Sequence, residues 1–315
     1  MTSLPILIIG FVRPEGIERL LTSLQVGQVS RVYLAVDGPR NSQDRRSQKI
    51  LVEFAQTFAR NQNIPISIWQ RDTNLGIAVS IISAIDWFFT SEHFGLILED
   101  DLIVGKDFIP FVIKAKAILE TQDDVVMISG NQFFPKYGSK RIMATHYPQI
   151  WGWATTSKKW QILRSGLVEQ DRIRFKDFLS PKRSYWAIGA RRALSGRVDT
   201  WDIPIARYMI SNAKLCLIPP CNLVSNVGFD QHASHTALKV FPLDVPTEEL
   251  DCKDLALEIP TFSNICDYDS KLEKYVFLIS PRRILSLPIG LIRLSRMSKS
   301  NSLLLRLASS EATVP

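Results

Sequence analysis

The stretch "LPILIIGFVRPEGIERLLTSLQVGQVSRVYLAVD", residues 4–37, predicts the fold. Residues 4–11 are almost all apolar, as expected of a strand that is buried on both faces. Residues 13–24 follow with apolar side chains at helical spacing, and residues 31–37 form a second apolar run that ends on Asp37. A strand, a helix and a second strand in this order predict a βαβ unit with parallel strands.

The alternation of strands and helices continues along the chain. The pattern predicts helices at 42–62, 74–89 and near 107–120, and strands at 65–70, 94–100 and 124–130. We therefore expect a single main α/β domain with a largely parallel, Rossmann-like sheet flanked by helices. Such sheets bind ligands at the carboxyl ends of their strands.

Three consecutive acids, Glu99, Asp100 and Asp101, follow the apolar run 94–98. Adjacent carboxylates repel one another, and no basic residue directly precedes or follows them in the sequence. Aspartate oxygens suit hard cations, and a site with one or two protein carboxylates completes its coordination with water and substrate phosphates. The acids therefore predict a Mg²⁺ or Mn²⁺ site that takes a nucleoside diphosphate, with Arg13 and Asp37 at neighbouring strand ends.

Composition limits the class of protein. The chain has 315 residues, 46% of them hydrophobic, which is typical of a globular protein with a sizeable core. The N-terminal apolar run has no basic residues before it and no cleavage signal after it, and no uncharged run is long enough to span a bilayer. The four cysteines form no CxxC pair. We expect a cytoplasmic protein with reduced thiols.

The basic charge is concentrated at the C-terminus. Residues 282–315 carry six basic side chains and one acidic one, a net charge of +5 within the total of +7. Because these cations alternate with Leu and Ile, the tail fits a peripheral segment on an anionic membrane surface. A C-terminal helix packed on the domain fits the same pattern, and the sequence leaves both open. No nucleic-acid partner is expected, because the rest of the chain is nearly neutral and shows no recognition motif.

The segment "LILEDDLIVGKDFIPFV", residues 96–112, resembles the Glu-Asp-Asp-Leu form of the DxD metal motif of GT-A glycosyltransferases. The resemblance is strongest to the N-acetylglucosaminyltransferase I type and its bacterial relatives. It extends to "FVRPEGIERLLTSL", "VYLAVDGPRN" and "NLGIAVSIISAIDWFF" in the donor half, and to "IWGWATTSKKW" and residues 200–236 in the acceptor half. It implies a GT-A-like domain at 1–236, with a donor half at about 1–130 and an acceptor half at about 131–236.

The resemblance also implies roles for single residues. Asp101 would ligate Mn²⁺ or Mg²⁺, and Glu99 and Asp100 would face the sugar and ribose of the donor. Arg13 matches an arginine that contacts the nucleotide. Asp37 matches an aspartate that binds the uracil end, so a UDP-sugar is the favoured donor.

Asp202 matches the general base that takes the proton of the acceptor hydroxyl. The animal enzymes carry two adjacent acids here, whereas this chain has one, and Asp199 is the second candidate. A carboxylate beside Trp201 sits in a partly apolar setting that raises its proton affinity. Asp202 followed closely by Pro204 also fits the start of a helix, and the two roles are compatible.

Further expectations concern the acceptor half and the C-terminal third. His235, and less directly His232, would contact the diphosphate from a loop that closes over the donor. Trp151 and Trp153 fit either a sugar platform or core packing. Residues 237–280 predict an extended covering segment and residues 281–315 a basic amphipathic tail.

The sequence thus predicts a metal-dependent glycosyltransferase that transfers a sugar to a hydroxyl of a glycan or lipid-linked acceptor, in surface polysaccharide or glycan synthesis. One base implies inversion, since no second nucleophile is identified. A sugar nucleotidyltransferase shares the architecture but requires a glycine-rich basic loop after the first strand, which "GFVRPEG" matches poorly. A non-catalytic membrane-surface protein would need only the tail.

Overall fold

The computed structural model describes residues 3–135, 139–168, 180–228, 245–279, 302–303 and 306–307. Among these residues, eight strands form one sheet with the order β3-β2-β1-β4-β8-β6-β9-β7, and β5 pairs with β10 in a separate ribbon. The strands are β1 (Leu4–Gly10), β2 (Val29–Val36), β3 (Ile66–Gln70), β4 (Phe94–Glu99), β5 (Leu102–Val104), β6 (Val125–Ser129), β7 (Met143–Thr145), β8 (Trp153–Thr156), β9 (Leu215–Ile218) and β10 (Val224–Asn226). The helices are α1 (Pro14–Ser23), α2 (Ser42–Asn61), α3 (Ile77–Ser91), α4 (Phe108–Thr121), α5 (Ser157–Val168), α6 (Pro181–Leu194), α7 (Asp202–Ser211) and α8 (Phe262–Lys271), with a 3₁₀ turn at Val26–Gln28 and a π-helical turn at Leu272–Val276.

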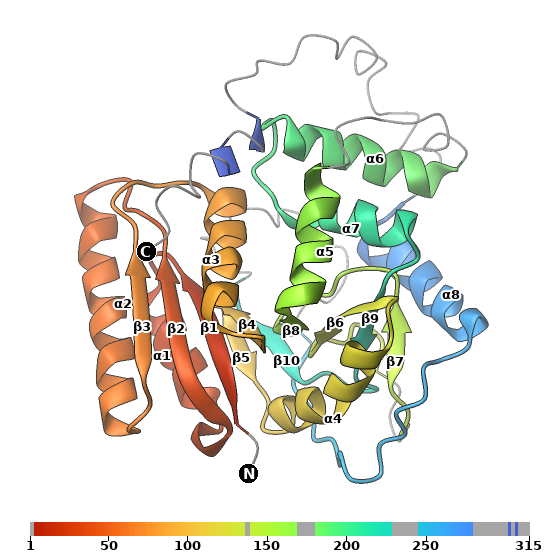
Figure 1. The fold of residues 1–315 in the computed structure, drawn as a ribbon, viewed down its shortest axis with the longest axis horizontal. Helices are drawn as coiled ribbons and strands as arrows, with labels where there is room; N and C mark the ends of the chain where they lie inside the picture. The colour runs from red at the N-terminus through yellow and green to blue at the C-terminus, as the bar shows by residue number, and fades with distance from the viewer. Residues whose placement is uncertain are drawn as a thin grey trace.

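The predicted fold class is confirmed. Strands β3, β2, β1 and β4 run parallel, and β6 runs parallel to β9. The sheet is flanked by helices, and the N-terminal βαβ unit occupies its left half in Figure 1. The predicted strands at 4–11, 31–37, 65–70, 94–100 and 124–130 correspond to β1, β2, β3, β4 and β6.

Two antiparallel strands interrupt the parallel order. Strand β8 lies between β4 and β6 and is antiparallel to both, and β7 is antiparallel to β9 at the edge of the sheet. The sequence pattern did not predict β8, because it has four residues, too few to show a period, and all four are buried. Because β8 runs antiparallel to β4, the segment that precedes β8 lies at the carboxyl edge of the parallel strands.

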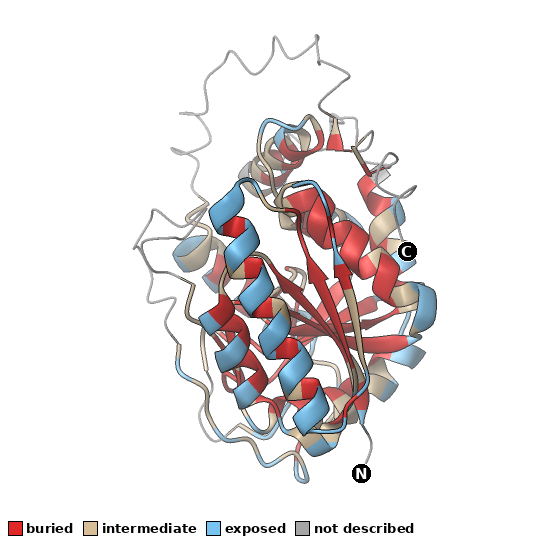
Figure 2. Cartoon of the chain, turned by 90° about the vertical axis from the view of Figure 1, so that its left-hand side faces the viewer, coloured by how far each residue is buried: buried red, intermediate tan, exposed pale blue. Residues whose placement is uncertain are grey.

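Alternate residues of the central strands enter two different cores. Ile6, Ile8 and Leu34 pack with the apolar sides of α1, α2 and α4. Leu7 and Ile9 on the opposite face pack with α3, α5 and α7. Because both faces of the sheet are covered, the central strands are buried throughout, and the helices expose only their outer sides (Figure 2).

The C-terminal third differs from the predicted extended covering segment. Residues 245–260 contain no helix or strand, and they are held over α4 by a hydrogen bond from the Leu250 amide to Asp107 Oδ2 at 2.9 Å. Residues 262–276 are helical instead of extended, because Thr261 caps α8 and Ile265, Tyr268 and Leu272 provide an apolar stripe at helical spacing. The predicted division of the chain at residues 236 and 280 stays a prediction.

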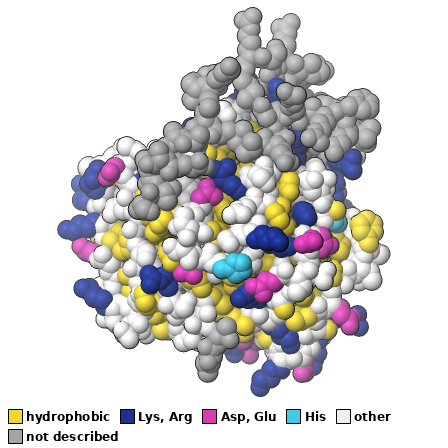
Figure 3. Space-filling model, viewed as in Figure 1, with side chains coloured by type: hydrophobic (Ala, Val, Ile, Leu, Met, Phe, Trp, Pro, Cys, Tyr) yellow, Lys and Arg dark blue, Asp and Glu magenta, His cyan; other side chains and the backbone are white. Residues whose placement is uncertain are grey.

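The basic tail lies mostly outside the described residues. Leu303 and Leu307, which the structure does describe, are each 2% exposed and pack in the core on the α3 side of the sheet. At these two positions the tail packs on the domain, which was the second of the two predicted alternatives. Their side chains are buried in the protein and are not presented to a membrane. On the face seen in Figure 3, Lys and Arg side chains are interspersed with Asp and Glu. None of the described helices combines the length and apolar character needed to cross a membrane.

Helix α1 packs closely against the turn that carries the acids. A Cβ atom built on Gly16 would lie 2.1 Å from the backbone oxygen of Asp100. No side chain fits at that distance, so glycine at this position allows the helix to approach the end of β4.

We predict that Gly16→Ala lowers the free energy of unfolding by about 1–3 kcal/mol, although alanine favours helices, because the helix must shift away from the turn. Gly27→Ala is the matched control, since nothing lies within 4 Å of a Cβ there. Urea unfolding of both variants measures the difference. Equal stability of the two variants would contradict the close packing of α1 on the turn.

Candidate functional site

The three acids lie where β4 ends at the carboxyl edge of the sheet. Glu99 is the last residue of β4 and pairs with Ile9 of β1, and Asp100 and Asp101 form the turn into β5. The Asp100 amide donates to the Ile9 carbonyl at 3.1 Å, which fixes the turn to the neighbouring strand. The sequence therefore places the acids as predicted, on a rigid strand end.

The segment after β1 supplies partners to two of the acids. The Phe11 amide donates to Asp100 Oδ2 at 2.9 Å. Arg13 Nη1 lies 3.1 Å from Asp101 Oδ2 and 3.6 Å from Asp100 Oδ1. Arg13 precedes Pro14, the first residue of α1, so the start of the helix directs the guanidinium toward the acids.

The ribbon formed by β5 and β10 holds Asp101 from the other side. The Val227 amide donates to the Asp101 carbonyl at 2.8 Å, and the Asn226 side chain hydrogen-bonds the Asp101 carboxylate. Asn226 Oδ1 in turn accepts from the Gly228 amide at 2.7 Å. A Cβ atom on Gly228 would lie 2.3 Å from Asp101 Oδ2, so glycine is required for this approach. Sequence reasoning missed Asn226, because only the pairing of β10 with β5 places it here.

Asp202, from a distant part of the chain, lies near Glu99 at this edge. It is the first residue of α7, Trp201 is the N-cap residue, and Thr200 Oγ1 donates to Asp202 Oδ1. Its carboxylate lies close enough to Glu99 to raise the pKa of that acid. Asp202, about a hundred residues further along the chain, therefore adds a fourth carboxylate near the three consecutive acids, and Arg13 pairs with Asp100 and Asp101.

Burial raises the pKa values of Glu99 and Asp100, and the excess negative charge adds to the shift. Burial, followed by Asp101, Asp100 and Asp202, raises the pKa of Glu99 well above its ordinary value. Burial and then Asp101 raise the pKa of Asp100 to about 7. Burial also raises the pKa of Asp101, although Arg13 and Asn226 oppose the shift. A cation among these groups would relieve the repulsion.

The donor set fits a divalent metal that is completed by other ligands. Within the described part of the chain, no three His, Cys, Asp or Glu side chains converge on one point as a full protein cage would require. The Asp101 side chain is 21% exposed and that of Asp100 11%, so the Asp101 carboxylate is the group that a Mg²⁺ or Mn²⁺ ion can reach. Such an ion would take its remaining ligands from water and phosphate.

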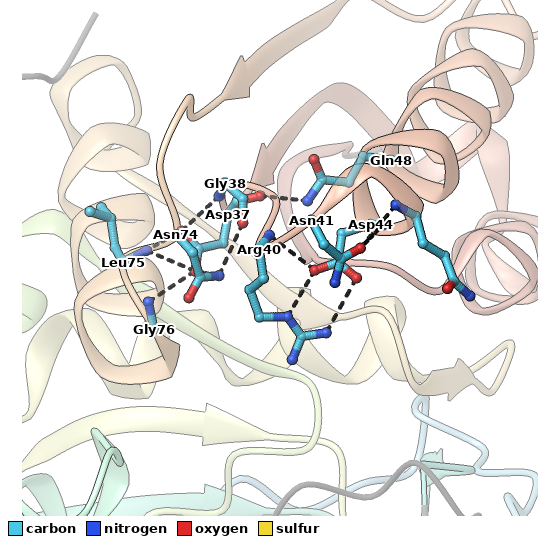
Figure 4. Close-up of polar contacts among 10 residues, drawn as sticks. Asp37, Gly38, Arg40, Asn41, Asp44, Gln48, Asn74, Leu75 and Gly76 are labelled. Atoms are coloured by element: carbon cyan, nitrogen blue, oxygen red, sulfur yellow. Dashed lines mark hydrogen bonds and ion pairs between the residues drawn. The ribbon is translucent and has the colours of Figure 1, made fainter.

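Asp37 lies at the predicted strand end but is fully engaged within the protein (Figure 4). Its carboxylate accepts from the amides of Gly38 and Leu75 at 2.9 Å and of Gly76 at 3.0 Å, and from Asn74 Nδ2 at 2.9 Å. Burial raises the pKa of Asp37 in spite of these bonds. Asp37 thus holds the loop that leads into α3, and a direct contact to a nucleobase stays a prediction.

Asp199 is occupied in a similar way. Its carboxylate accepts from the amides of Ile77 at 2.8 Å and Ala78 at 3.0 Å, which caps the N-terminus of α3 from a distant part of the chain. Gly76 provides no side-chain cap for this helix and has φ = 79°. A carboxylate that is used as a helix cap is a poorer candidate for the general base than Asp202.

The two tryptophans of the "IWGWAT" segment, Trp151 and Trp153, lie on opposite sides of the sheet. Trp153 is 1% exposed and stacks on Trp201 at 5.8 Å between ring centroids, so it serves the core. Trp151 is half-buried beside Phe133, at 5.0 Å between centroids. Gly152 lies between them with φ = 64°, a conformation that reverses the normal alternation and sends Trp151 to the α4 side of the sheet. His232 and His235 lie outside the described residues.

Comparisons with known proteins add little beyond general architecture. The sequence matches no protein-family profile, and no curated protein matches it. Among solved structures, UTP-bound UGPase from Acinetobacter baumannii has 9% identity and a TM-score of 0.39 over 74% of this chain and 91% of that one. UDP-glucose pyrophosphorylase complexed with UDP-glucose has 10% identity and a TM-score of 0.38 over 69% and 90%. TarS 1-349 from S. aureus has 15% identity and a TM-score of 0.32 over 61% of this chain and 55% of its own length.

We predict that Asp100→Asn raises stability at pH 8 but has little effect near pH 4. The folded protein keeps Asp100 protonated up to about pH 7 while the unfolded chain ionises near 3.8, so this acid removes stability as the pH rises through that window. The variant avoids this loss, which amounts to about 2–4 kcal/mol. Asn retains an oxygen that can accept from the Phe11 amide.

Urea unfolding at pH 4 and pH 8, without divalent cations, measures the effect. Asp72→Asn, at an exposed position, is the control for removal of one negative charge. The prediction is wrong if Asp100→Asn gains no more stability at pH 8 than the control does.

Proposed function

We propose that this protein is a metal-dependent glycosyltransferase that moves a sugar from a nucleoside diphosphate sugar, with UDP-sugars favoured, to a hydroxyl acceptor with inversion. The observation that carries the proposal is that Glu99, Asp100 and Asp101 lie together at the end of β4, with Asp202 near enough to Glu99 to raise its pKa. A donor site and an acceptor-side base must share such an edge, because the hydroxyl attacks the carbon that the diphosphate leaves.

Asp101 would hold the divalent cation, whose chemistry is to neutralise the charge that develops on the leaving diphosphate. Glu99 and Asp100 would accept hydrogen bonds from the hydroxyls of the donor sugar and ribose. Arg13 would contact the nucleotide phosphates, and Asp37 would shape the base-side wall through the loop at residues 74–76. His235 is proposed to contact the diphosphate.

Asp202 would take the proton from the acceptor hydroxyl as that oxygen attacks the anomeric carbon. A single attack from the side opposite the leaving group inverts the configuration, and no covalent intermediate is needed. The charge of Asp202 contributes to the raised pKa of Glu99, so the proposed base lies near the proposed donor-binding acids. We place the acceptor among surface polysaccharides and lipid-linked glycans.

A sugar nucleotidyltransferase is the second candidate. Solved nucleotidyltransferase structures such as the UGPase share the general architecture, but the turn after β1 offers Phe11, Val12 and Arg13 where a basic glycine-rich loop would be needed. Release of pyrophosphate from UTP and a sugar 1-phosphate would favour this candidate over the transferase.

We predict that UDP raises the melting temperature of the wild type by several degrees when Mn²⁺ is present, and that Asp101→Asn loses this shift. A ligand at about 100 times its Kd adds about 2.7 kcal/mol to the folded state. Asp123→Asn, at an exposed turn, should behave as the wild type. If no nucleoside diphosphate or nucleotide sugar stabilises the folded wild type, the proposed donor site does not exist.

We predict opposite effects for the two candidate bases. Asp202→Asn should lower kcat for transfer by about 10²-fold or more while Mn²⁺-dependent UDP binding is retained. Asp199→Asn should keep turnover but lower the free energy of unfolding by about 1 kcal/mol, because it weakens the cap of α3. Initial rates and urea unfolding of both variants decide the assignment, and full activity of Asp202→Asn would remove it from the mechanism.

A further inference from the structure

Arg13 contacts Asp100 and Asp101 through only one of its guanidinium nitrogens. Nη1 makes both contacts, at 3.1 Å to Asp101 Oδ2 and 3.6 Å to Asp100 Oδ1. No other side-chain hydrogen bond of Arg13 occurs within the described part of the chain. Since a guanidinium has five N–H donors in a planar fork, most of its donor capacity is available for another anion.

Asp100 and Asp101 have several partners in the protein, whereas the Arg13 side chain makes hydrogen bonds and ion pairs only with these two acids among the described residues. Asp100 is held by the Phe11 amide, and Asp101 is held by Asn226 and by close contact with Gly228. The Arg13 side chain is 27% exposed and reaches the acids from the N-cap position of α1 on a long stem. A change at this site therefore moves the guanidinium more easily than the carboxylates.

Arg13 and a divalent cation require the same atom. The pairing uses Asp101 Oδ2, and the same carboxylate is the group that a metal ion can reach. Two positive groups on one carboxylate repel each other, so a metal ion at Asp101 and Arg13 in its present position exclude one another in part.

We propose that Arg13 is a displaceable internal counter-ion. In the free protein it neutralises Asp101, and when donor and metal bind together it releases Asp101 and pairs with the diphosphate oxygens. This inference rests on the proposed function and adds a regulation to the same site. Arg13 then disfavours metal binding without nucleotide and favours metal binding with it, so the protein takes up the two ligands together. By linkage, each ligand raises the affinity for the other by the same factor.

The test compares Mn²⁺ binding alone with UDP binding at saturating Mn²⁺, both by isothermal titration calorimetry. Arg13→Gln should bind Mn²⁺ alone about tenfold or more tightly than the wild type, because a positive charge near the ligand carboxylate is removed. Its affinity for UDP should fall about tenfold. Arg13→Lys, which keeps the charge, should stay near the wild type for Mn²⁺ alone.

Arg19→Gln is the matched control, since it removes one positive charge from an exposed position on the same helix. It should not change either affinity. The melting temperature of each variant without ligand shows whether it is folded. Should Arg13→Gln not fold, Arg13→Met removes the same charge and is measured in its place. Independent binding of Mn²⁺ and UDP by the wild type would also overturn the proposal.

The experiment distinguishes failure of the counter-ion inference from failure of the proposed function. If the wild type binds UDP with Mn²⁺ but Arg13→Gln binds Mn²⁺ no more tightly than the wild type, Arg13 does not compete for Asp101 and only this inference falls. The same holds if Arg19→Gln matches Arg13→Gln, since the effect is then one of net charge. If the wild type binds neither Mn²⁺ nor UDP, the proposed function itself fails and the inference falls with it.

Discussion

The structure depends on burying negative charge at the end of β4. Glu99, Asp100 and Asp101 are brought into the protein by a strand whose other residues are fully apolar, and their mutual repulsion has to be offset from elsewhere. Two separate segments do this. The turn after β1 provides the Phe11 amide and Arg13, and the β5–β10 ribbon provides Asn226. The packing of these segments around the acids creates the candidate site.

A second group of carboxylates acts at the N-terminus of α3. Asp37 at the end of β2 and Asp199 before α7 accept hydrogen bonds from four consecutive amides, those of residues 75–78. The first helical amides lack partners within a helix, and the helix dipole favours negative charge there. The loop that leads into α3 and the segment before α7 are therefore joined by hydrogen bonds. Arg306 of the tail donates to the Leu75 carbonyl at the same place, so the basic C-terminus contributes to this junction.

The two groups explain why carboxylates that look alike in the sequence have different roles. Asp37 and Asp199 each accept from backbone amides and act as structural anchors. Asp101 and Asp202 are part-exposed, and they accept hydrogen bonds from the side chains of Arg13 and Thr200. Available lone pairs and access to solvent, not the residue type, mark the acids that can act on a ligand.

The sequence by itself determined the βαβ order, the parallel left half of the sheet and the position of the acids at a strand end, because these follow from local periodicity over long apolar runs. It did not determine β8, the Asn226 contact, the engagement of Asp37 and Asp199, or the approach of Asp202 to Glu99. Each of these depends on residues that are tens of positions apart in the chain, and local pattern carries no information on such pairings. Only the tertiary structure decided them, since packing around a buried charge selects which distant groups meet.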